Sequence, residues 1–454
     1  MNGMTLSEAA RLIEARHIGA DAVFTAVSSD TRNLENGDLF VALRGHSFDG
    51  HEFIGQARER GACAAVVSRD LPASLPLLLV ADTRLALGRL AAGWRARTDI
   101  PVVAVTGSNG KTTVKEMTAA ILARRGRVLA TRGNLNNDIG VPLTLLRLRP
   151  EHRHAVIEMG ANHPGEIAYL TRLAQPTVAL ITNAGPAHLE GFGDVAGVAR
   201  AKGEIYGGLR REGVAVINAD DAHAGLWREL TRKHRVLTFG LNAAADVTVL
   251  QAQDQADTRI RLQTPVGRVD VALPLPGRHN VMNALAATAA ALACGATLQD
   301  VKQGLESMQP VSGRLQSHAG PHGARIIDDT YNANPASLAA ALEVLAASGG
   351  ERWLVLGDMG ELGAAGPEMH WAVGRQARSA GVQRLYATGE LSRLAVQAFG
   401  AGARHFDDPQ ALIAALQADL HAGLTVLIKG SRAMRMERVA QALGAAAPSH
   451  GGQH

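Results

Sequence analysis

The stretch that decides the fold is Pro101-Val102-Val103-Ala104-Val105-Thr106-Gly107-Ser108-Asn109-Gly110-Lys111-Thr112-Thr113. Its apolar run leads into a glycine-containing loop, and Lys-Thr-Thr then opens a segment of helical pattern. In such a strand–loop–helix unit, backbone N–H groups and the helix N-terminus surround a polyphosphate. Val105 stands where the usual phosphate loop has its first glycine, but the compact Gly-x-x-Gly-Lys-Thr form presents the same groups. The alternative is a glycine turn without a ligand.

The favoured interpretation is a nucleotide-phosphate site in which Lys111 neutralises phosphate charge and Thr112 can hold Mg²⁺. The residues of this predicted site are Gly107, Ser108, Asn109, Gly110, Lys111, Thr112 and Thr113.

On both sides of this unit, apolar strand patterns alternate with helical patterns, which predicts a mostly parallel sheet. Residues 246–273 instead alternate in the manner of antiparallel strands, and two helices are predicted after them. The strands expected in the sheet are Val102–Val105, His154–Glu158, Val178–Thr182, Val214–Asn218 and Val236–Phe239, and the two helices are His279–Cys294 and Gln299–Met308.

Two further α/β blocks flank this central one. We therefore expect three linked α/β domains: a smaller domain at 1–98 that ends in a connector helix, a central domain at 99–312, and a doubly wound, Rossmann-like domain at 313–454. The length of 454 residues fits about three domains. The tail after Ala445 is expected to be disordered.

Polar residues follow two consecutive strands of the central block. Glu158 ends one strand, and His188 lies in the loop after the next. Ligands gather at the carboxyl ends of parallel strands, so both side chains can face the phosphate loop and its metal. Each alone could equally be an ordinary surface or packing residue, but their occurrence after neighbouring strands favours the functional interpretation of both.

Other candidates are open on sequence alone. Lys202 lies on a predicted helix and has the pattern of an exposed lysine. Asn280 and Asn283 share one face of a helix, where they could read a purine edge or cap the helix. In the third block, the segments Asp328–Pro335 and Lys429–Arg432 each follow a strand. They could bind ribose, carboxylate or phosphate groups, or they could reflect turn chemistry and a basic helix start.

Composition excludes several classes of protein. Apolar residues make up 46% of the chain and charged residues 19%, which is unlike a disordered chain. No apolar run is long enough for a membrane span, and no secretion signal is apparent. Aromatic residues are only 4% and the net charge is +4 with dispersed basic residues, so a nucleic-acid partner is not expected. Cys63 and Cys294 are predicted to be buried thiols, and we expect a cytoplasmic protein.

Taken together, these motifs resemble the Mur ligases, the ATP-dependent amide-forming enzymes of peptidoglycan synthesis, over essentially the whole chain. Within that family the third-block motifs are similar to those of the branch that adds D-alanyl-D-alanine to UDP-N-acetylmuramoyl-tripeptide. The motifs that carry the resemblance are Ser29–Arg32, Gly37–Leu43, Asp49–His51, the phosphate loop, Glu158–Asn162, the His188 segment, Arg278–Asn280, Tyr331–Pro335, Gly357–Gly363 and Lys429–Arg432.

The resemblance implies roles for individual residues. Lys111 and the loop would bind ATP phosphates, and Thr112, Glu158 and His188 would hold Mg²⁺ together with a carbamylated Lys202. Asn280 and Asn283 would contact adenine, and Arg314 and Asp329 would contact ATP from the C-terminal domain. The UDP-sugar site would include Ser29, Asp30, Thr31 and Arg32, where Thr31 replaces the commoner serine. The incoming dipeptide would meet Asn332, Asn334, Lys429, Ser431 and Arg432.

The implied reaction forms an acyl phosphate from the tripeptide carboxylate and ATP, and the dipeptide amine then displaces phosphate. Because the implied ATP contacts are split between two domains, nucleotide is expected to draw them together. Folylpolyglutamate synthase shares the phosphate loop and the last two domains. It lacks a UDP-binding first domain, however, so the block at residues 1–98 argues against it. A GTPase is disfavoured because no Asn-Lys-x-Asp motif is present, and a nonenzymatic nucleotide-binding scaffold would leave the polar strand ends unexplained. We expect a monomer.

Overall fold

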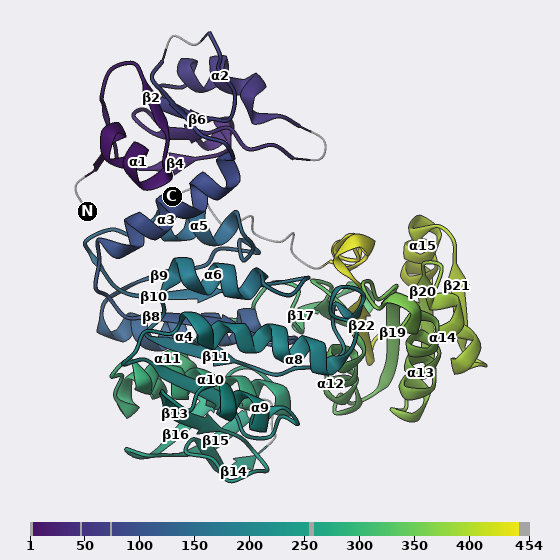
Figure 1. Cartoon of the computed structure of the whole chain (residues 1–454). Coiled ribbons are helices and arrows are strands. Elements are labelled where there is room, and N and C mark those ends of the chain that lie inside the picture. The colour runs from purple at the N-terminus through teal and green to yellow at the C-terminus, as the bar shows by residue number, and fades with distance from the viewer. Residues whose placement is uncertain (1–2, 46–47, 73–74, 254–257, 445–454) are drawn as a thin grey trace.

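The computed structural model describes residues 3–45, 48–72, 75–253 and 258–444. Figure 1 shows three α/β bodies that follow one another along the chain. The N-terminal body sits above the central one, and the C-terminal body lies to one side of it. The predicted α/β class is confirmed. The tail after Ala445 lies outside the described residues.

The N-terminal body is built on a five-stranded sheet in the order β2-β7-β6-β5-β4, in which only β2 runs antiparallel to its neighbour. A two-stranded ribbon, β1-β3, lies beside α1. The elements are β1 (Met4–Thr5), α1 (Leu6–Ile13), β2 (Arg16–Ile18), β3 (Val23–Phe24), β4 (Val27–Ser28), β5 (Leu39–Val41), α2 (Ile54–Glu59), β6 (Ala64–Val67), β7 (Leu77–Leu79) and α3 (Thr83–Ala96).

Helix α3 joins the first body to the second. It packs against α1 on one side and against α5 and α6 of the central body on the other. Trp94 is fully buried in this contact. The buried Arg95 guanidinium donates to the carbonyl oxygens of Ala174 (2.9 Å) and Thr98 (2.6 Å). Since Ala174 ends α6, Arg95 satisfies a carbonyl that the helix itself leaves open.

The central body contains a six-stranded, fully parallel sheet in the order β13-β12-β11-β8-β10-β9. Its inner strands are runs of buried Val, Ile, Leu and Ala, as expected of a sheet covered on both faces. Its elements are β8 (Val102–Thr106), α4 (Lys111–Leu122), β9 (Arg127–Ala130), α5 (Gly140–Leu145), β10 (His152–Glu158), α6 (Glu166–Ala174), β11 (Val178–Ile181), α7 (Leu189–Phe192), α8 (Val195–Gly203), β12 (Val214–Asn218), α9 (Ala224–Leu230) and β13 (Arg235–Phe239).

A small antiparallel sheet, β14-β15-β16, follows in the region where alternation predicted it. Helices α10 and α11 pack against α4, and the alanine-rich α10 also covers β11, β12 and β13. The elements of this part are β14 (Thr248–Gln253), β15 (Thr258–Thr264), β16 (Gly267–Leu273), α10 (Arg278–Ala293) and α11 (Leu298–Glu306).

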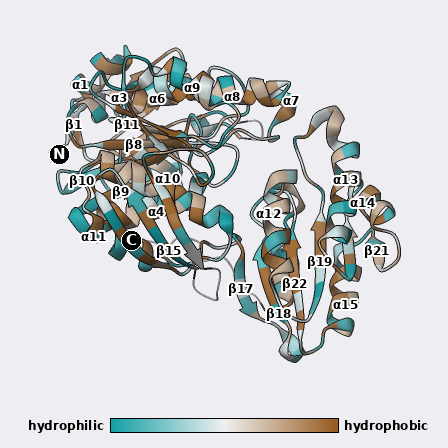
Figure 2. Cartoon of the chain, turned by 90° about the horizontal axis from the view of Figure 1, so that it is seen from below, coloured by the Kyte–Doolittle hydropathy of each residue, from teal (hydrophilic) through white to brown (hydrophobic). Residues whose placement is uncertain are grey.

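The C-terminal body has a second six-stranded sheet, β17-β18-β22-β19-β20-β21, in which only β17 is antiparallel. Its apolar strands lie between helices on both faces (Figure 2). The elements are β17 (Gln316–Ala319), β18 (Arg325–Asp329), α12 (Pro335–Ala346), β19 (Glu351–Gly357), α13 (Gly366–Ser379), β20 (Arg384–Thr388), α14 (Ser392–Phe399), β21 (Ala403–Phe406), α15 (Pro409–Asp419), β22 (Leu424–Lys429) and α16 (Glu437–Ala442).

Several strands exist that the sequence did not predict: β1 to β4, β9, β17 and β21. Most are two to four residues long, and β2, β4, β9, β17 and β21 lie at sheet edges. An edge strand is paired on one side only, so its sequence lacks the continuous apolar run of an inner strand.

The two cysteines are less buried than the sequence predicted. Cys63 and Cys294 are free thiols of intermediate exposure, although each packs against a hydrophobic core. Burial of the Cys294 sulfur raises the pKa of its thiol to about 12. Across the described part of the chain, no helix combines the length and apolar character that crossing a membrane requires.

Candidate active site

The phosphate loop adopts a backbone path that only glycine tolerates at two points. Gly107 has φ +151° and Gly110 has φ +80°. A Cβ atom on Gly107 would lie 1.8 Å from Oγ1 of Thr182, and one on Gly110 would lie 2.4 Å from Oδ1 of Asn283. The loop is therefore packed tightly between the end of β11 and helix α10, and Gly110 directly precedes α4.

The segment after β11 holds this loop in place. The carbonyl oxygen of Asn183 accepts a hydrogen bond from the Ser108 amide (3.0 Å), and Oδ1 of Asn183 accepts one from the Asn109 amide (2.9 Å). The Ser108 hydroxyl donates to the carbonyl oxygen of Gly185 (3.1 Å). The amides of Ser108 and Asn109 are thus occupied by the protein. The first turn of α4 has no helical acceptors for its own N–H groups, so phosphate would be met there, at Lys111 to Thr113.

The Lys111 ammonium folds back over the loop. Its Nζ donates to the carbonyl oxygens of Gly107 (2.6 Å) and Ser108 (3.3 Å). Burial lowers the pKa of Lys111, while the carboxylates of Glu158 and Glu361 act in the opposite direction. Lys111 is thus a positive charge held at the helix start, between two acidic side chains.

Glu158 ends β10 and is 1% exposed. Its Oε1 accepts a hydrogen bond from Nδ2 of Asn136 (2.8 Å), while its Oε2 is buried and has no protein partner. A buried carboxylate oxygen left open beside a phosphate loop is the kind of ligand that Mg²⁺ takes. The donor chemistry of Glu158 therefore fits a magnesium ion, and so does that of the hydroxyl of Thr112, which follows Lys111 in the first turn of α4.

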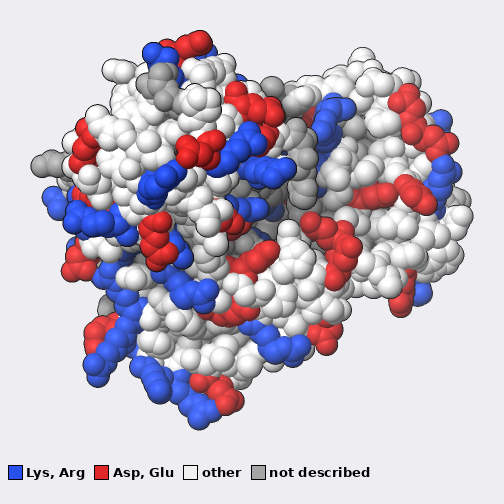
Figure 3. Space-filling model, turned by 45° about the horizontal axis from the view of Figure 1, so that its top comes forward, with Lys and Arg blue, Asp and Glu red and all other residues white. Residues whose placement is uncertain are grey.

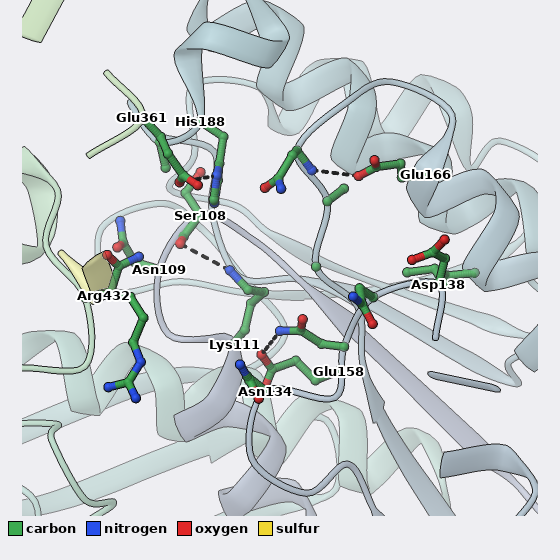
Figure 4. Close-up of a pocket in the computed structure, with 18 of the residues that line it drawn as sticks. Ser108, Asn109, Lys111, Asn134, Asp138, Glu158, Glu166, His188, Glu361 and Arg432 are labelled. Atoms are coloured by element: carbon green, nitrogen blue, oxygen red, sulfur yellow. Dashed lines mark hydrogen bonds and ion pairs between the residues drawn. The ribbon is translucent and has the colours of Figure 1, made fainter. Parts of the chain in front are cut away.

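His188 reaches the same site from the loop after β11, with φ +55°. Its Nδ1 lies 2.6 Å from Oε2 of Glu361, which belongs to the C-terminal body (Figure 4). This contact lowers the pKa of the Glu361 carboxyl, and burial acts against that shift. This contact connects the central and C-terminal bodies across the site.

These groups line a cavity of about 720 Å³. Figure 3 shows a hollow between the two larger bodies, with acidic and basic side chains on its margins. The start of α3 contributes Asp82 and Arg84, and the central body contributes the phosphate loop, Asn134, Asn136, Asn137, Asp138, Glu158 and His188. From the C-terminal body come Arg314, Tyr331, Asn332, Ala333, Asn334, Ser337, Gly360, Glu361 and Arg432.

Two more contacts fix the C-terminal wall of the cavity. Nδ2 of Asn334 donates to Oδ1 of Asn109 (2.8 Å), which ties the C-terminal body directly to the phosphate loop. The Arg314 guanidinium stacks over the Tyr331 ring at 4.1 Å. Since Nε of Arg314 is buried without a protein partner, this cation has hydrogen-bonding capacity left for a ligand.

Lys202 is not the exposed lysine that its pattern suggests. It is 2% exposed on α8, and no carboxylate lies at ion-pair distance from it among the described residues. Burial, with Lys111 as a second cause, sets the pKa of Lys202 well below its ordinary value. Burial therefore favours the neutral amine more than in an exposed lysine, and the neutral amine is the form that reacts with CO₂.

Some predicted residues lie behind the cavity wall. Asp329 and Lys429 are buried and paired with each other (Oδ2 to Nζ, 2.5 Å), and Lys429 also donates to the carbonyl oxygen of Asn332 (2.9 Å). Ser431 is buried, and its amide donates to the carbonyl oxygen of Asp358 (2.9 Å). The structure therefore gives these three residues internal partners, whereas Arg432 lines the cavity.

Asn280 and Asn283 are buried side by side at the start of α10. Asn280 donates to the carbonyl oxygen of Pro276 (2.8 Å), and Asn283 donates to Oδ1 of Asn280 (3.3 Å). The N-cap residue is Gly277, so neither asparagine caps the helix. Asn283 packs against Gly110 of the phosphate loop instead.

The predicted UDP-sugar residues lie in the N-terminal body, outside the cavity lining. Ser29 and Asp30 follow β4, and Asp30 forms an ion pair with Arg32 (2.7 Å), which lowers the pKa of that carboxyl. The Thr31 hydroxyl donates to Oε1 of Gln56 (2.6 Å).

Sequence reasoning missed the loop Asn134–Asp138 and gave no role to Glu361 or Tyr331. The loop follows β9, an unpredicted edge strand, so the strand-end argument that found Glu158 was not applied to it. Its run Asn134-Leu135-Asn136-Asn137-Asp138 is a polar cluster of the same kind and could have been found in that way.

Three family models match the chain in order. They are the Mur ligase family catalytic domain at residues 23–95, the Mur ligase middle domain at 105–291, and the Mur ligase glutamate ligase domain at 313–432. Together they cover well over half of the chain.

Named relatives match over nearly the full length. The UDP-N-acetylmuramoyl-tripeptide–D-alanyl-D-alanine ligase of Escherichia coli K12 is 49% identical over 447 residues, covering 98% of this chain and 99% of the relative. A crystal structure of MurF from Acinetobacter baumannii superposes with a TM-score of 0.91 at 39% identity, covering 98% and 99% of the two chains. MurF of Thermotoga maritima in complex with ADP superposes with a TM-score of 0.80 at 29% identity, covering 92% and 96%.

Proposed function

This chain belongs to the Mur ligase family, and from that membership we propose that it joins D-alanyl-D-alanine to UDP-N-acetylmuramoyl-tripeptide with consumption of ATP. The reaction is a step of peptidoglycan precursor synthesis. The observation that carries the proposal is one cavity lined by a phosphate loop, by the start of α3 near the N-terminal body, and by a C-terminal wall of amide, guanidinium and carboxylate groups. A ligase that uses ATP, UDP-N-acetylmuramoyl-tripeptide and D-alanyl-D-alanine needs a binding surface for each of these three substrates.

In the proposed first step, the terminal carboxylate of the tripeptide attacks the γ-phosphorus of ATP. An acyl phosphate forms and ADP leaves. The amides at the start of α4 and the Lys111 ammonium stabilise the charge that develops on the phosphate oxygens. In the second step, the dipeptide amine attacks the acyl carbon, the bond from that carbon to the phosphate oxygen breaks, and the departing phosphate takes up the proton that the amine loses.

We propose that Thr112, Glu158, His188 and a carbamylated Lys202 hold Mg²⁺. When bound, this ion supplies positive charge to the transferring phosphoryl group. The open Oε2 of Glu158 and the burial of the Lys202 amine, which lowers its pKa, support this assignment. A carbamate on Lys202 would place an anion near the Lys111 ammonium, which attracts it.

The remaining proposed contacts follow from the family. Asn280 and Asn283 would meet adenine, with Arg314 and Asp329 on the C-terminal side. Ser29, Asp30, Thr31 and Arg32 would bind the UDP end. The dipeptide would lie against Asn332, Asn334 and Arg432, with Lys429 and Ser431 supporting that wall from behind. A cytoplasmic monomer stays the prediction made from the sequence.

Phosphate release measured with purified protein tests the proposal. Release should require ATP, UDP-N-acetylmuramoyl-tripeptide and D-alanyl-D-alanine together, and free D-alanine should not replace the dipeptide. Release that depends on neither dipeptide nor amino acid would contradict ligase activity. Release with glutamate and a folate acceptor would instead favour folylpolyglutamate synthesis.

A further inference from the structure

Glu361 has features that the proposed reaction has so far left unused. It comes from the segment Gly360-Glu361-Leu362-Gly363 between β19 and α13, and it lines the cavity from the C-terminal body. Its backbone has φ +61°, a left-handed conformation that costs a residue with a Cβ atom free energy. A glutamate held in that conformation at a cavity wall marks a position where the direction of the side chain matters.

The charge on the C-terminal wall is asymmetric. Of the described residues from that body that line the cavity, Arg314 and Arg432 carry positive charge and Glu361 alone carries negative charge. The dipeptide that enters on this side is a zwitterion with an α-ammonium at one end and a carboxylate at the other. An ammonium arriving there meets one carboxylate, and the dipeptide carboxylate can meet the guanidinium of Arg432, one nitrogen of which already pairs with Glu437 (3.2 Å).

The present partner of Glu361 places this carboxylate beside residues to which we assign magnesium and phosphate binding. Its Oε2 lies 2.6 Å from Nδ1 of His188, and its charge also acts on Lys111 of the phosphate loop. Figure 4 shows Glu361 and His188 pointing toward each other at the edge of the cavity, above Lys111. A cation bound by Glu361 would therefore lie next to the place where the acyl phosphate forms.

We propose that Glu361 binds the α-ammonium of the incoming dipeptide, accepts one proton from it, and positions the resulting amine for attack on the acyl phosphate. This assignment rests on the proposed ligase function and names the residue that selects an amine nucleophile. When the dipeptide binds, its ammonium replaces the His188 imidazole as the partner of the Glu361 carboxylate, and Nδ1 of His188 is released. Dipeptide binding and the loss of the contact between Glu361 and His188 therefore occur together.

The test compares wild-type protein with Glu361→Gln, which keeps the size of the side chain and removes its charge. Loss of a charged hydrogen-bond partner predicts a rise of about tenfold or more in KM for D-alanyl-D-alanine. KM for ATP and for UDP-N-acetylmuramoyl-tripeptide should stay within about twofold, and so should the amount of acyl phosphate trapped by borohydride without dipeptide. The matched control is Glu190→Gln, because Glu190 is exposed and lies beside Gly363 without lining the cavity.

A second readout reports on the ammonium itself. Propionyl-D-alanine has the shape of the dipeptide without its amine, and as an inhibitor it should bind wild-type protein more weakly than the dipeptide binds. In Glu361→Gln the two affinities should converge, and Glu361→Asp should restore part of the difference. An unchanged dipeptide KM, an equal rise in all three KM values, or unchanged discrimination would overturn the proposal. If wild-type protein showed no dipeptide-dependent phosphate release, the ligase function itself would fail, which is a separate result.

Discussion

Nδ2 of Asn334 donates a hydrogen bond to Oδ1 of Asn109 across 2.8 Å, and this contact joins the C-terminal body to the phosphate loop. Asn334 has a second role, because its Oδ1 accepts the Ser337 amide (2.9 Å) as the N-cap of α12. One side chain thus starts a helix with its oxygen and connects two domains with its nitrogen.

These two roles can be separated with Asn334→Ser. Serine is as good an N-cap as asparagine but lacks the amide that reaches Asn109. We expect unchanged thermal stability and a KM for ATP raised up to about fivefold, since a neutral hydrogen bond contributes about 1 kcal/mol. Small-angle scattering should show a larger radius of gyration than wild type, and nucleotide with UDP-substrate should reduce it in both proteins. Ser337→Ala is the control, since it removes the hydroxyl that accepts the Asn334 amide (3.0 Å) in the cap and leaves the contact with Asn109. Equal radii and KM values would show that the contact does not couple the domains.

Lys111→Ala should remove activity while leaving the fold intact. The Nζ atom donates only to carbonyl oxygens of its own loop among the described residues, so its loss leaves no carboxylate without a partner. We expect kcat to fall by about 10² or more, because the ammonium stabilises charge on the transferring phosphate. Circular dichroism checks the fold. Near-wild-type turnover in a folded variant would mean that the loop is a turn without a phosphate.

Asn136→Ala tests how the Glu158 carboxylate is oriented. Removing the 2.8 Å hydrogen bond from Asn136 lets Glu158 rotate. Partners of this kind typically change metal affinity by about 10- to 100-fold when lost, so the Mg²⁺ concentration for half-maximal rate should rise by about that factor. Asn134→Ala is the matched control from the same loop, because Asn134 lines the cavity without bonding Glu158. An equal Mg²⁺ requirement in both variants would remove Asn136 from this role.

Lys202→Ala should lose most activity while ATP still binds. Burial lowers the pKa of this amine and so favours its neutral form more than in an exposed lysine, and a carbamate there would supply oxygens that magnesium accepts. Protein equilibrated with ¹³C-labelled CO₂ should show a carbamate signal that Lys202→Ala lacks and Lys302→Ala keeps, since Lys302 is an exposed partner of Glu306. Acetate at high concentration should partly restore turnover in Lys202→Ala. Normal activity in that variant would return Lys202 to a packing role.

The sequence predicted those parts of the site that depend on local pattern. The phosphate loop, Glu158 and His188 each follow a buried parallel strand, and the fold brings such strand ends to one edge of the sheet. The inner strands were recognised for the same reason, because they are continuous apolar runs. Edge strands such as β9 and β21 have no such run, and the loop Asn134–Asp138 was missed together with β9.

Other features depend on contacts between distant segments. Glu361 meets His188 across 173 positions of sequence, and only the packing of two bodies brings them to 2.6 Å. The segment around Lys202 has the composition of a surface helix, and the burial of Lys202 appears only when α8 is placed on the central body. The pairing of Asp329 with Lys429 follows from the parallel alignment of β18 and β22, which the strand patterns alone do not specify.

Transfer of oxygen tests the acyl-phosphate ligase mechanism most directly. UDP-N-acetylmuramoyl-tripeptide labelled with ¹⁸O in its terminal carboxylate is incubated with ATP, D-alanyl-D-alanine and the protein, and both products are analysed by mass spectrometry. The account predicts UDP-N-acetylmuramoyl-pentapeptide that keeps one labelled oxygen in the new amide, and phosphate that carries the other. Phosphate without label, or phosphate formed with no pentapeptide, would contradict it.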